Sequence, residues 1–217
     1  TPDSFYDGER SFSENQFVEK GLGLLETGCC ILDVGGESTR PGAKQVMSNR
    51  EIERVVGVIE KIKKSAPSAI ISVDTRKANV AEKALQAGAS IVNDISAGSF
   101  DKKMFNVVAK YKAGICLMHS QGLPENMQDS PYYENVLLDI YDYLEAKIID
   151  AERKGISREK IIVDPGIGFG KSFGHNLEII KKVSLFLGLG CPLMIGLSRK
   201  SFIDEIISKR LPSERLA

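Results

Sequence analysis

The sequence lacks a net charge, and it lacks any long hydrophobic run. In its 217 residues, 29 Lys and Arg balance 29 Asp and Glu, and the pI is about 6.7. Without a basic excess there is no electrostatic footprint for nucleic acid and no polybasic anchor for a membrane surface. No segment approaches the roughly 18 apolar residues that a membrane-spanning helix requires. The sequence therefore predicts a soluble protein with a small-molecule partner, and neither a nucleic acid nor a membrane as partner.

Cysteine is also scarce, and none of it forms a CxxC pair. The four cysteines are Cys29, Cys30, Cys116 and Cys191. Three of them lie inside or beside strand-like runs, where Cys behaves as a small hydrophobe, so we expect reduced thiols in the core. This usage, together with the lack of a secretory leader in the sequence, predicts a cytoplasmic protein.

Two common ligand motifs are missing as well. The glycine-rich segment 165–172 has three residues, not the required four, between Gly166 and the Gly-Lys pair of a phosphate loop, and it reads GxGxG where a dinucleotide site needs GxGxxG. The only histidines, His119 and His175, have no acid at a metal-ligand spacing. We therefore expect no nucleotide site and no zinc site, and we interpret both histidines as structural or supporting residues.

What the chain does contain is a set of short apolar runs that each stop on an acid or an amide. Four of these runs occupy residues 31–33, 70–74, 91–94 and 161–164. Ile and Val without polar alternation are typical of parallel strands buried on both faces. A polar residue at the end of each strand predicts a cluster of hydrogen-bonding groups above a closed parallel barrel.

Helical periodicity separates these runs. It predicts helices over residues 17–27, 51–64, 77–87, 102–110, 134–154 and 176–187, with another beginning near Ser201, and further strands over 114–118 and 193–197. Strict alternation is compatible with an open doubly wound sheet or an eight-stranded barrel. Because an open sheet gathers its ligand groups at one switch point, polar residues after nearly every strand favour the barrel.

The predicted fold class is therefore α/β, a (β/α)8 TIM barrel, with residues 1–217 as one domain. The sequence supplies six of the eight strands. We accordingly expect one strand before Thr1 and one βα unit after Ala217.

Seven segments carry a family resemblance. They read TPDSF, DVGGESTRPGA, SVDT, NDI, MH, DPGIGFGK and SRKSF, begin at residues 1, 33, 72, 93, 118, 164 and 198, and span the whole chain. Together they resemble dihydropteroate synthase. The resemblance implies a barrel enzyme, usually a homodimer and a target of sulfonamides, that joins 4-aminobenzoate to 6-hydroxymethyl-7,8-dihydropterin diphosphate with Mg²⁺ as cofactor. It also implies a dissociative mechanism, in which the diphosphate leaves before the amine attacks.

A pterin edge needs carboxylate acceptors, an amide and a cationic donor. The resemblance assigns pterin binding to Asp74, Asn93, Met118, Asp164, Gly168, Phe169 and Lys200. On local grounds alone, an Asp that ends a strand is also a common N-cap of the following helix.

The resemblance assigns 4-aminobenzoate binding to Phe5, Thr39, Pro41, Lys171 and Ser201. It assigns catalysis to Asp7, Arg40, Asp74, Asp164 and Lys200. Locally, Ser201 is equally compatible with a helix N-cap, and the loops of Arg40 and Asp7 with ordinary turns. The family's metal-binding Asn would precede Thr1, so the metal ligands stay unassigned. Two other functions remain open, a corrinoid-linked methyltetrahydrofolate methyltransferase pterin domain and a noncatalytic pterin-binding barrel.

Overall fold

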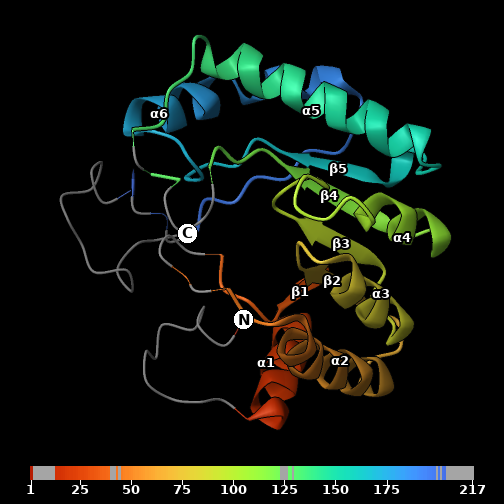
Figure 1. Ribbon diagram of the computed structural model, residues 1–217. Coiled ribbons are helices and arrows are strands. Elements are labelled where there is room, and N and C mark those ends of the chain that lie inside the picture. The colour runs from red at the N-terminus through yellow and green to blue at the C-terminus, as the bar shows by residue number, and fades with distance from the viewer. Residues whose placement is uncertain are drawn as a thin grey trace.

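The computed structural model describes residues 1, 13–39, 43, 45–122, 127–128, 130–198, 200 and 202–203 (Figure 1). The strands are β1 (Ile31–Gly35), β2 (Ile70–Asp74), β3 (Ile91–Asp94), β4 (Gly114–Met118) and β5 (Ile161–Asp164). The helices are α1 (Glu14–Glu26), α2 (Ser48–Ser65), α3 (Ala78–Gln86), α4 (Met104–Lys110), α5 (Val136–Arg153) and α6 (Phe173–Lys181). A 3-10 helix, η2 (Arg158–Lys160), precedes β5, and a second one, η3 (Val183–Leu189), follows α6.

The five strands form one parallel sheet in the order β1-β2-β3-β4-β5. Each strand therefore lies beside its predecessor, and the winding never reverses as it does at the switch point of a doubly wound sheet. Figure 1 shows the strands in a curved sheet with α2 to α5 along its outer side. This winding confirms the predicted α/β class and favours the barrel over the open sheet.

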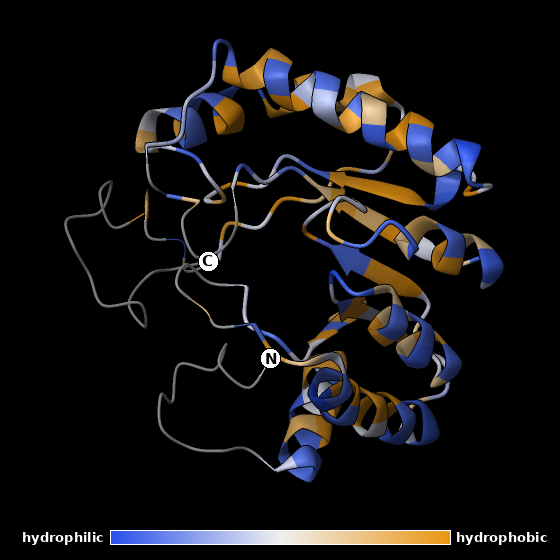
Figure 2. Cartoon of the chain, in the orientation of Figure 1, coloured by the Kyte–Doolittle hydropathy of each residue, from blue (hydrophilic) through white to orange (hydrophobic). Residues whose placement is uncertain are grey.

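Apolar side chains fill the space between the sheet and the helices. Alternate residues such as Ile71, Val73 and Val92 face the helices and are completely buried, as are Val55 and Ile59 of α2. Figure 2 shows the same pattern, with hydrophobic residues on the strands and on parts of each helix. This outer face of the sheet forms the core, and the strand-end polar side chains lie on the inner face together with several apolar ones.

Side-chain caps fix where several helices begin. Ser13 and Gln16 form a reciprocal capping box at the start of α1, and the Asn135 side chain accepts from two backbone N–H groups at the start of α5. Such caps satisfy donors that the first helical turn leaves free. Among the described residues, no helix is both long enough and apolar enough to cross a membrane.

The structure corrects two predicted elements near the end of the chain. Of the strand predicted over 193–197, only a bridge between Leu193 and Val163 is present, preceded by Pro192, which has no N–H to donate. The helix predicted over 176–187 is divided into α6 and η3, because the backbone leaves helical geometry at Lys182, where φ is −116°. The apolar pattern continues across this break, so periodicity alone does not reveal it.

The prediction of core thiols is correct for two cysteines. Cys116 and Cys191 are buried, Cys29 is half-buried, Cys30 is exposed, and all four are free. Cys30 precedes β1 rather than lying within it, which explains why its side chain escapes the core.

Candidate active site

The parallel register collects the strand-end residues on the inner face of the sheet. One row across this face contains Gly35, Asp74, Asn93, Cys116 and Ile162. Met118 pairs with Asp164 one row beyond it, and Asp33 pairs with Ser72 one row before it. The predicted pterin residues on β2 to β5 therefore share one face.

Asp74 and Asn93 each present a buried oxygen atom without a donor among the described residues. These atoms are Oδ1 of Asp74 and Oδ1 of Asn93. Burial, together with the nearby charge of Asp33, raises the pKa of Asp74 well above its ordinary value. The nitrogen of the Asn93 amide does have a partner, because Nδ2 donates a hydrogen bond of 3.0 Å to Asp33 Oδ2. We call Asp33, Asp74 and Asn93 the open cluster.

Asp164 is buried on the next row and is partly satisfied by its own loop. Its Oδ1 accepts a hydrogen bond of 2.7 Å from the backbone N–H of Gly166. Burial raises the pKa of Asp164, although that hydrogen bond and the charges of Lys200 and Lys171 oppose the shift. Asp164 is thus a carboxylate with two ammonium groups in its surroundings.

Lys200 lies beside the glycine-rich loop that follows β5. Its ammonium nitrogen is 4.2 Å from the centroid of the Phe169 ring, and burial lowers its pKa. A Cβ atom at Gly168, where φ is +81°, would approach Lys200 Cδ to 3.2 Å. The structure therefore brings together Gly168, Phe169, Lys200 and Asp164, four of the residues that the resemblance assigned to pterin binding.

Lys171 is buried against the glycine-rich loop and His119. Its side chain nitrogen lies 3.0 Å from His119 Nδ1 and donates to the carbonyl oxygens of His119 and Phe169 over 3.3 and 2.9 Å. Burial lowers the pKa of Lys171 to about 7, and burial and Lys171 together lower that of His119 to about 3. Gly166 permits this packing, because its φ is +69° and a Cβ atom there would lie 1.9 Å from the His119 carbonyl oxygen.

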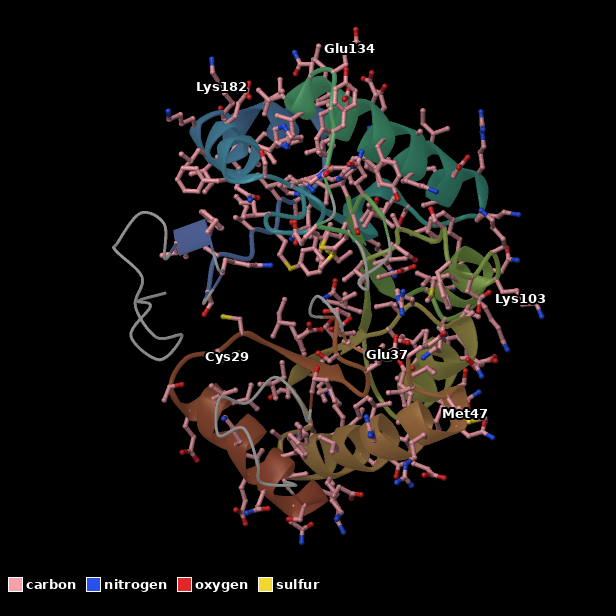
Figure 3. The ribbon with its side chains drawn as sticks, turned by 60° about the vertical axis from the view of Figure 1, so that its left-hand side comes forward. Cys29, Glu37, Met47, Lys103, Glu134 and Lys182 are labelled. Atoms are coloured by element: carbon pink, nitrogen blue, oxygen red, sulfur yellow. The ribbon has the colours of Figure 1, made fainter. Side chains whose placement is uncertain are left out.

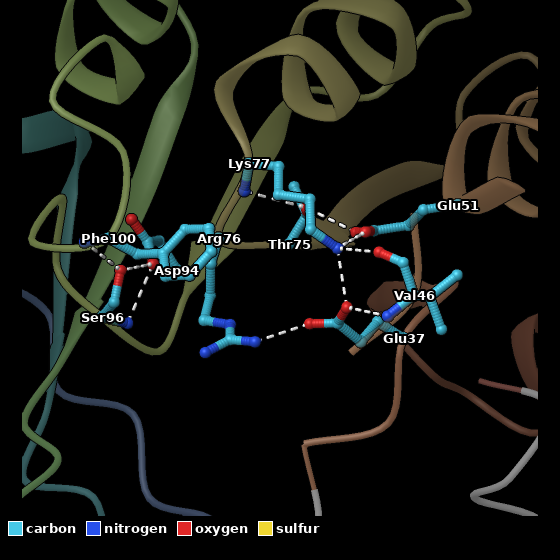
Figure 4. Close-up of polar contacts among 9 residues, drawn as sticks. All are labelled: Glu37, Val46, Glu51, Thr75, Arg76, Lys77, Asp94, Ser96 and Phe100. Atoms are coloured by element: carbon cyan, nitrogen blue, oxygen red, sulfur yellow. Dashed lines mark hydrogen bonds and ion pairs between the residues drawn. The ribbon is translucent and has the colours of Figure 1, made fainter. Parts of the chain in front are cut away.

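A second set of buried polar residues joins the loop after β1 to the loop after β2 (Figure 4). Lys77 Nζ donates to Glu37 Oε2 over 2.6 Å and to Glu51 Oε2 over 2.5 Å. The remaining carboxylate oxygens accept from Arg76 (2.7 Å) and from Thr75 Oγ1 (2.5 Å). We call Glu37, Glu51, Thr75, Arg76 and Lys77 the closed network. Every carboxylate oxygen in it has a donor.

Burial alone would raise the pKa of Glu37, but hydrogen bonds from Lys77, Arg76 and the Val46 N–H outweigh it and lower the pKa. In Figure 3, Glu37 lies well inside the molecule, whereas Met47 and Lys103 lie at its outer edge. Two residues after Glu37, Thr39 is half-buried. The closed network therefore anchors the loop that leads to the predicted 4-aminobenzoate residues.

Several predicted residues cannot be placed. The residues that lie outside the described part of the chain are Phe5, Asp7, Arg40, Pro41 and Ser201. Conversely, the sequence analysis placed Asp33 in the strand-end cluster without a specific role, and it assigned no role to the closed network. Asp33 carried a signal, because it ends one of the four apolar runs, but nothing in the sequence shows that it contacts an amide 60 positions away.

Comparison with known proteins identifies the family. The model of the pterin binding enzyme family matches residues 1–217. The chain belongs to this family of pterin-binding enzymes. It is 40% identical to the dihydropteroate synthase of Escherichia coli K12 over 217 residues, which cover all of this chain and 76% of that protein.

Two solved relatives extend the likeness to the fold. Dihydropteroate synthase of Yersinia pestis in complex with a sulfonamide drug matches with a TM-score of 0.93 and 37% identity, over 99% of this chain and 77% of that one. Dihydropteroate synthase of Xanthomonas albilineans with 4-aminobenzoic acid matches with a TM-score of 0.89 and 38% identity, over 98% and 75%. The sheet of this pterin-binding enzyme is thus that of a TIM barrel, which confirms the predicted fold class.

Proposed function

We propose that the protein is a dihydropteroate synthase, which condenses 6-hydroxymethyl-7,8-dihydropterin diphosphate with 4-aminobenzoate to give 7,8-dihydropteroate and diphosphate. The observation that carries this proposal is the pair of buried acceptors on Asp74 and Asn93, on the same face of the sheet as Asp164, which has Lys200 in its surroundings. Buried acceptors without donors are costly unless a ligand supplies the hydrogen atoms. The edge of a pterin carries an amine and ring N–H groups that suit them. Relatives named dihydropteroate synthase support the same assignment.

In the proposed reaction the C–O bond to the diphosphate breaks, and the leaving group takes both electrons. The resulting pterin methyl cation is captured by the amine of 4-aminobenzoate, which then loses a proton. Asp74 and Asp164 stabilise the positive charge that spreads into the pterin ring, and such preorganised electrostatic stabilisation is often the largest catalytic contribution. Lys200 and Phe169 hold the ring. The chain needs no covalent nucleophile for this step.

The remaining assignments belong to the same proposal. Thr39, Pro41, Phe5, Lys171 and Ser201 hold 4-aminobenzoate, while Arg40 and Asp7 act at the departing diphosphate. The buried ammonium of Lys171 would serve the amine-binding side by fixing the loop of Phe169. A homodimer and a cytoplasmic location complete the proposal.

Mg²⁺ is the cofactor that this function implies. Within the described ranges, no three His, Cys, Asp or Glu side chains are grouped to hold a metal ion. We therefore name no protein ligand for it. When bound, Mg²⁺ would neutralise the diphosphate chiefly through phosphate oxygens.

The test is release of diphosphate by the purified protein from 6-hydroxymethyl-7,8-dihydropterin diphosphate and Mg²⁺, with and without 4-aminobenzoate. Release that requires the amine, with dihydropteroate as product, is the expected result. Asp164→Asn should lose most of this activity, whereas Asp150→Asn, on the exposed side of α5, should retain it. Pterin binding without release would favour the methyltransferase domain or the noncatalytic barrel instead.

A further inference from the structure

Asp33 is the residue of the open cluster to which the resemblance assigned no specific role. It lies on the inner face of β1, one row before Asp74, and it is exposed to the space in front of the sheet. Its Oδ2 accepts a hydrogen bond of 3.0 Å from Asn93 Nδ2, which comes from β3. Asp33 thus reaches past β2 to the amide of a predicted pterin ligand.

This contact fixes the orientation of the Asn93 amide. A carboxylate only accepts hydrogen bonds, whereas the two ends of an amide group differ, one donating and one accepting. The nitrogen of Asn93 must therefore face Asp33, and the oxygen must face away from it. That oxygen is the buried Oδ1 atom without a donor in the described part of the chain. Without a neighbour such as Asp33, the amide could turn end for end and present a donor instead.

We propose that Asp33 is a positioning residue of the pterin site, which holds the Asn93 amide so that the site presents an acceptor and thereby selects ring edges that carry a donor. This inference rests on the proposed function, because it takes the ligand to be a pterin. Asp33 acts through Asn93 and need not touch the ring.

A double-mutant cycle on pterin binding tests this inference. The dissociation constant of 6-hydroxymethylpterin is measured by calorimetry for the protein and for Asp33→Ala, Asn93→Ala and the double variant. Loss of a hydrogen bond to a charged group corresponds to a weakening of about tenfold or more, which we expect for Asp33→Ala. In the Asn93→Ala background, the same change should cost nothing further, because no amide remains to be oriented.

Two further readouts separate positioning from a merely structural role. Asp33→Asn keeps an acceptor oxygen and should restore part of the affinity that Asp33→Ala loses. In turnover, Asp33→Ala should raise KM for the dihydropterin diphosphate and leave KM for 4-aminobenzoate unchanged. Asp150→Ala, which removes an exposed carboxylate on α5, is the matched control and should change neither constant.

The outcomes are distinct. If Asp33→Ala weakens binding equally with and without Asn93, Asp33 acts on the ligand directly and the inference is wrong. If the protein binds the pterin and both Asp33 variants bind it unchanged, the inference also fails while the proposed function stands. If the protein itself binds no pterin, the proposed function fails, and the inference with it. Because Asp33 is exposed, we expect both Asp33 variants to fold, and thermal unfolding verifies the fold of every variant.

Discussion

The closed network and the open cluster are two groups of polar residues at the same end of the same sheet, and the oxygen atoms of their side chains are satisfied to opposite degrees. In the closed network, all four oxygens of Glu37 and Glu51 accept hydrogen bonds, and Lys77 lies between the two carboxylates. In the open cluster, Asp74 and Asn93 each keep a buried oxygen without a donor among the described residues. Both groups lose hydration on burial, but only in the closed network do neighbouring donors satisfy every carboxylate oxygen.

The same contrast between satisfied and unsatisfied oxygen atoms distinguishes Asp94 from its neighbour Asn93. Asp94 follows Asn93 on β3, faces the opposite side of the sheet, and accepts from the backbone of Ser96 and Gly98 over 2.8 Å in each case and from Ser96 Oγ over 2.6 Å. Side chains on a strand alternate between the two faces, so Asp94 completes a loop while Asn93 faces the proposed pterin site. Satisfied acids maintain the fold, whereas acids left without donors mark the place where a ligand supplies them.

The largest expected effect comes from removing the cation of the closed network. Lys77→Met leaves Glu37 and Glu51 buried without the ammonium between them, and breaking a buried ion pair in this way costs about 3–5 kcal/mol of unfolding free energy. Urea denaturation measures this loss. Lys110→Met, which breaks an exposed pair with Glu82, is the control and should barely shift the midpoint. If the two variants had the same urea midpoint, the closed network would stabilise the fold no more than an exposed ion pair does, and the comparison would fail.

Asp74→Asn should have the opposite effect to Lys77→Met: it should weaken pterin binding without lowering the stability of the fold. The pKa of Asp74 in the folded protein is raised, so its stabilising contribution is present below the unfolded pKa and is lost as pH rises through the folded pKa. At neutral pH an uncharged Asn therefore relieves a cost, and the free energy of unfolding should stay equal or increase. Pterin affinity should nevertheless fall by about tenfold to a hundredfold. Calorimetry measures the pterin affinity of this variant, and urea denaturation measures its free energy of unfolding. A clear loss of unfolding free energy would show that Asp74 stabilises the fold, contrary to this prediction.

Sequence patterns predicted the strands well because continuous Ile and Val runs allow few other structures. The same runs placed Asp74, Asn93 and Asp164 at or near strand ends, whereas their assignment to pterin binding came from the resemblance. They did not predict the end of the sheet near Leu193, where the structure has a single bridge in place of an apolar strand.

The closed network lay beyond sequence reasoning for a different reason. Glu51 has the sequence context of a solvent-facing residue in an amphipathic helix, yet only 1% of it is exposed. Its partner Lys77 is 26 positions away, and Glu37 is 40 positions from Lys77. Contacts over such separations depend on the winding of the chain, which local patterns do not encode. Resemblance, rather than local pattern, assigned Lys200 and Phe169, which the structure then brought within 4.2 Å.

A smaller expected effect is the pH dependence of pterin affinity, which tests the open cluster. Donors from a bound pterin favour the ionised form of Asp74, so binding releases a proton wherever the free carboxyl is protonated. Affinity should therefore fall as pH is lowered through the raised pKa of Asp74, by at most about tenfold per pH unit for this one group. In Asp33→Ala the fall should begin at lower pH, because Asp33 contributes to the shift. Calorimetry over a pH series measures both curves, and an unchanged curve in Asp74→Asn would contradict the assignment.

The smallest expected effect concerns Ser172, which follows Lys171 in the sequence and whose N–H and hydroxyl oxygen both form hydrogen bonds with His175. Its hydroxyl accepts from the His175 N–H over 3.2 Å, and its own N–H donates to the His175 ring over 3.3 Å, which together cap α6. Ser172→Ala should cost about 1 kcal/mol of stability, the usual loss for an N-cap. Pterin affinity should stay within about twofold, since the cap contributes no free acceptor to the inner face. A loss of affinity as large as that of Asp74→Asn would show that satisfied polar groups also bind the ligand, and the contrast between closed and open groups would no longer locate the site.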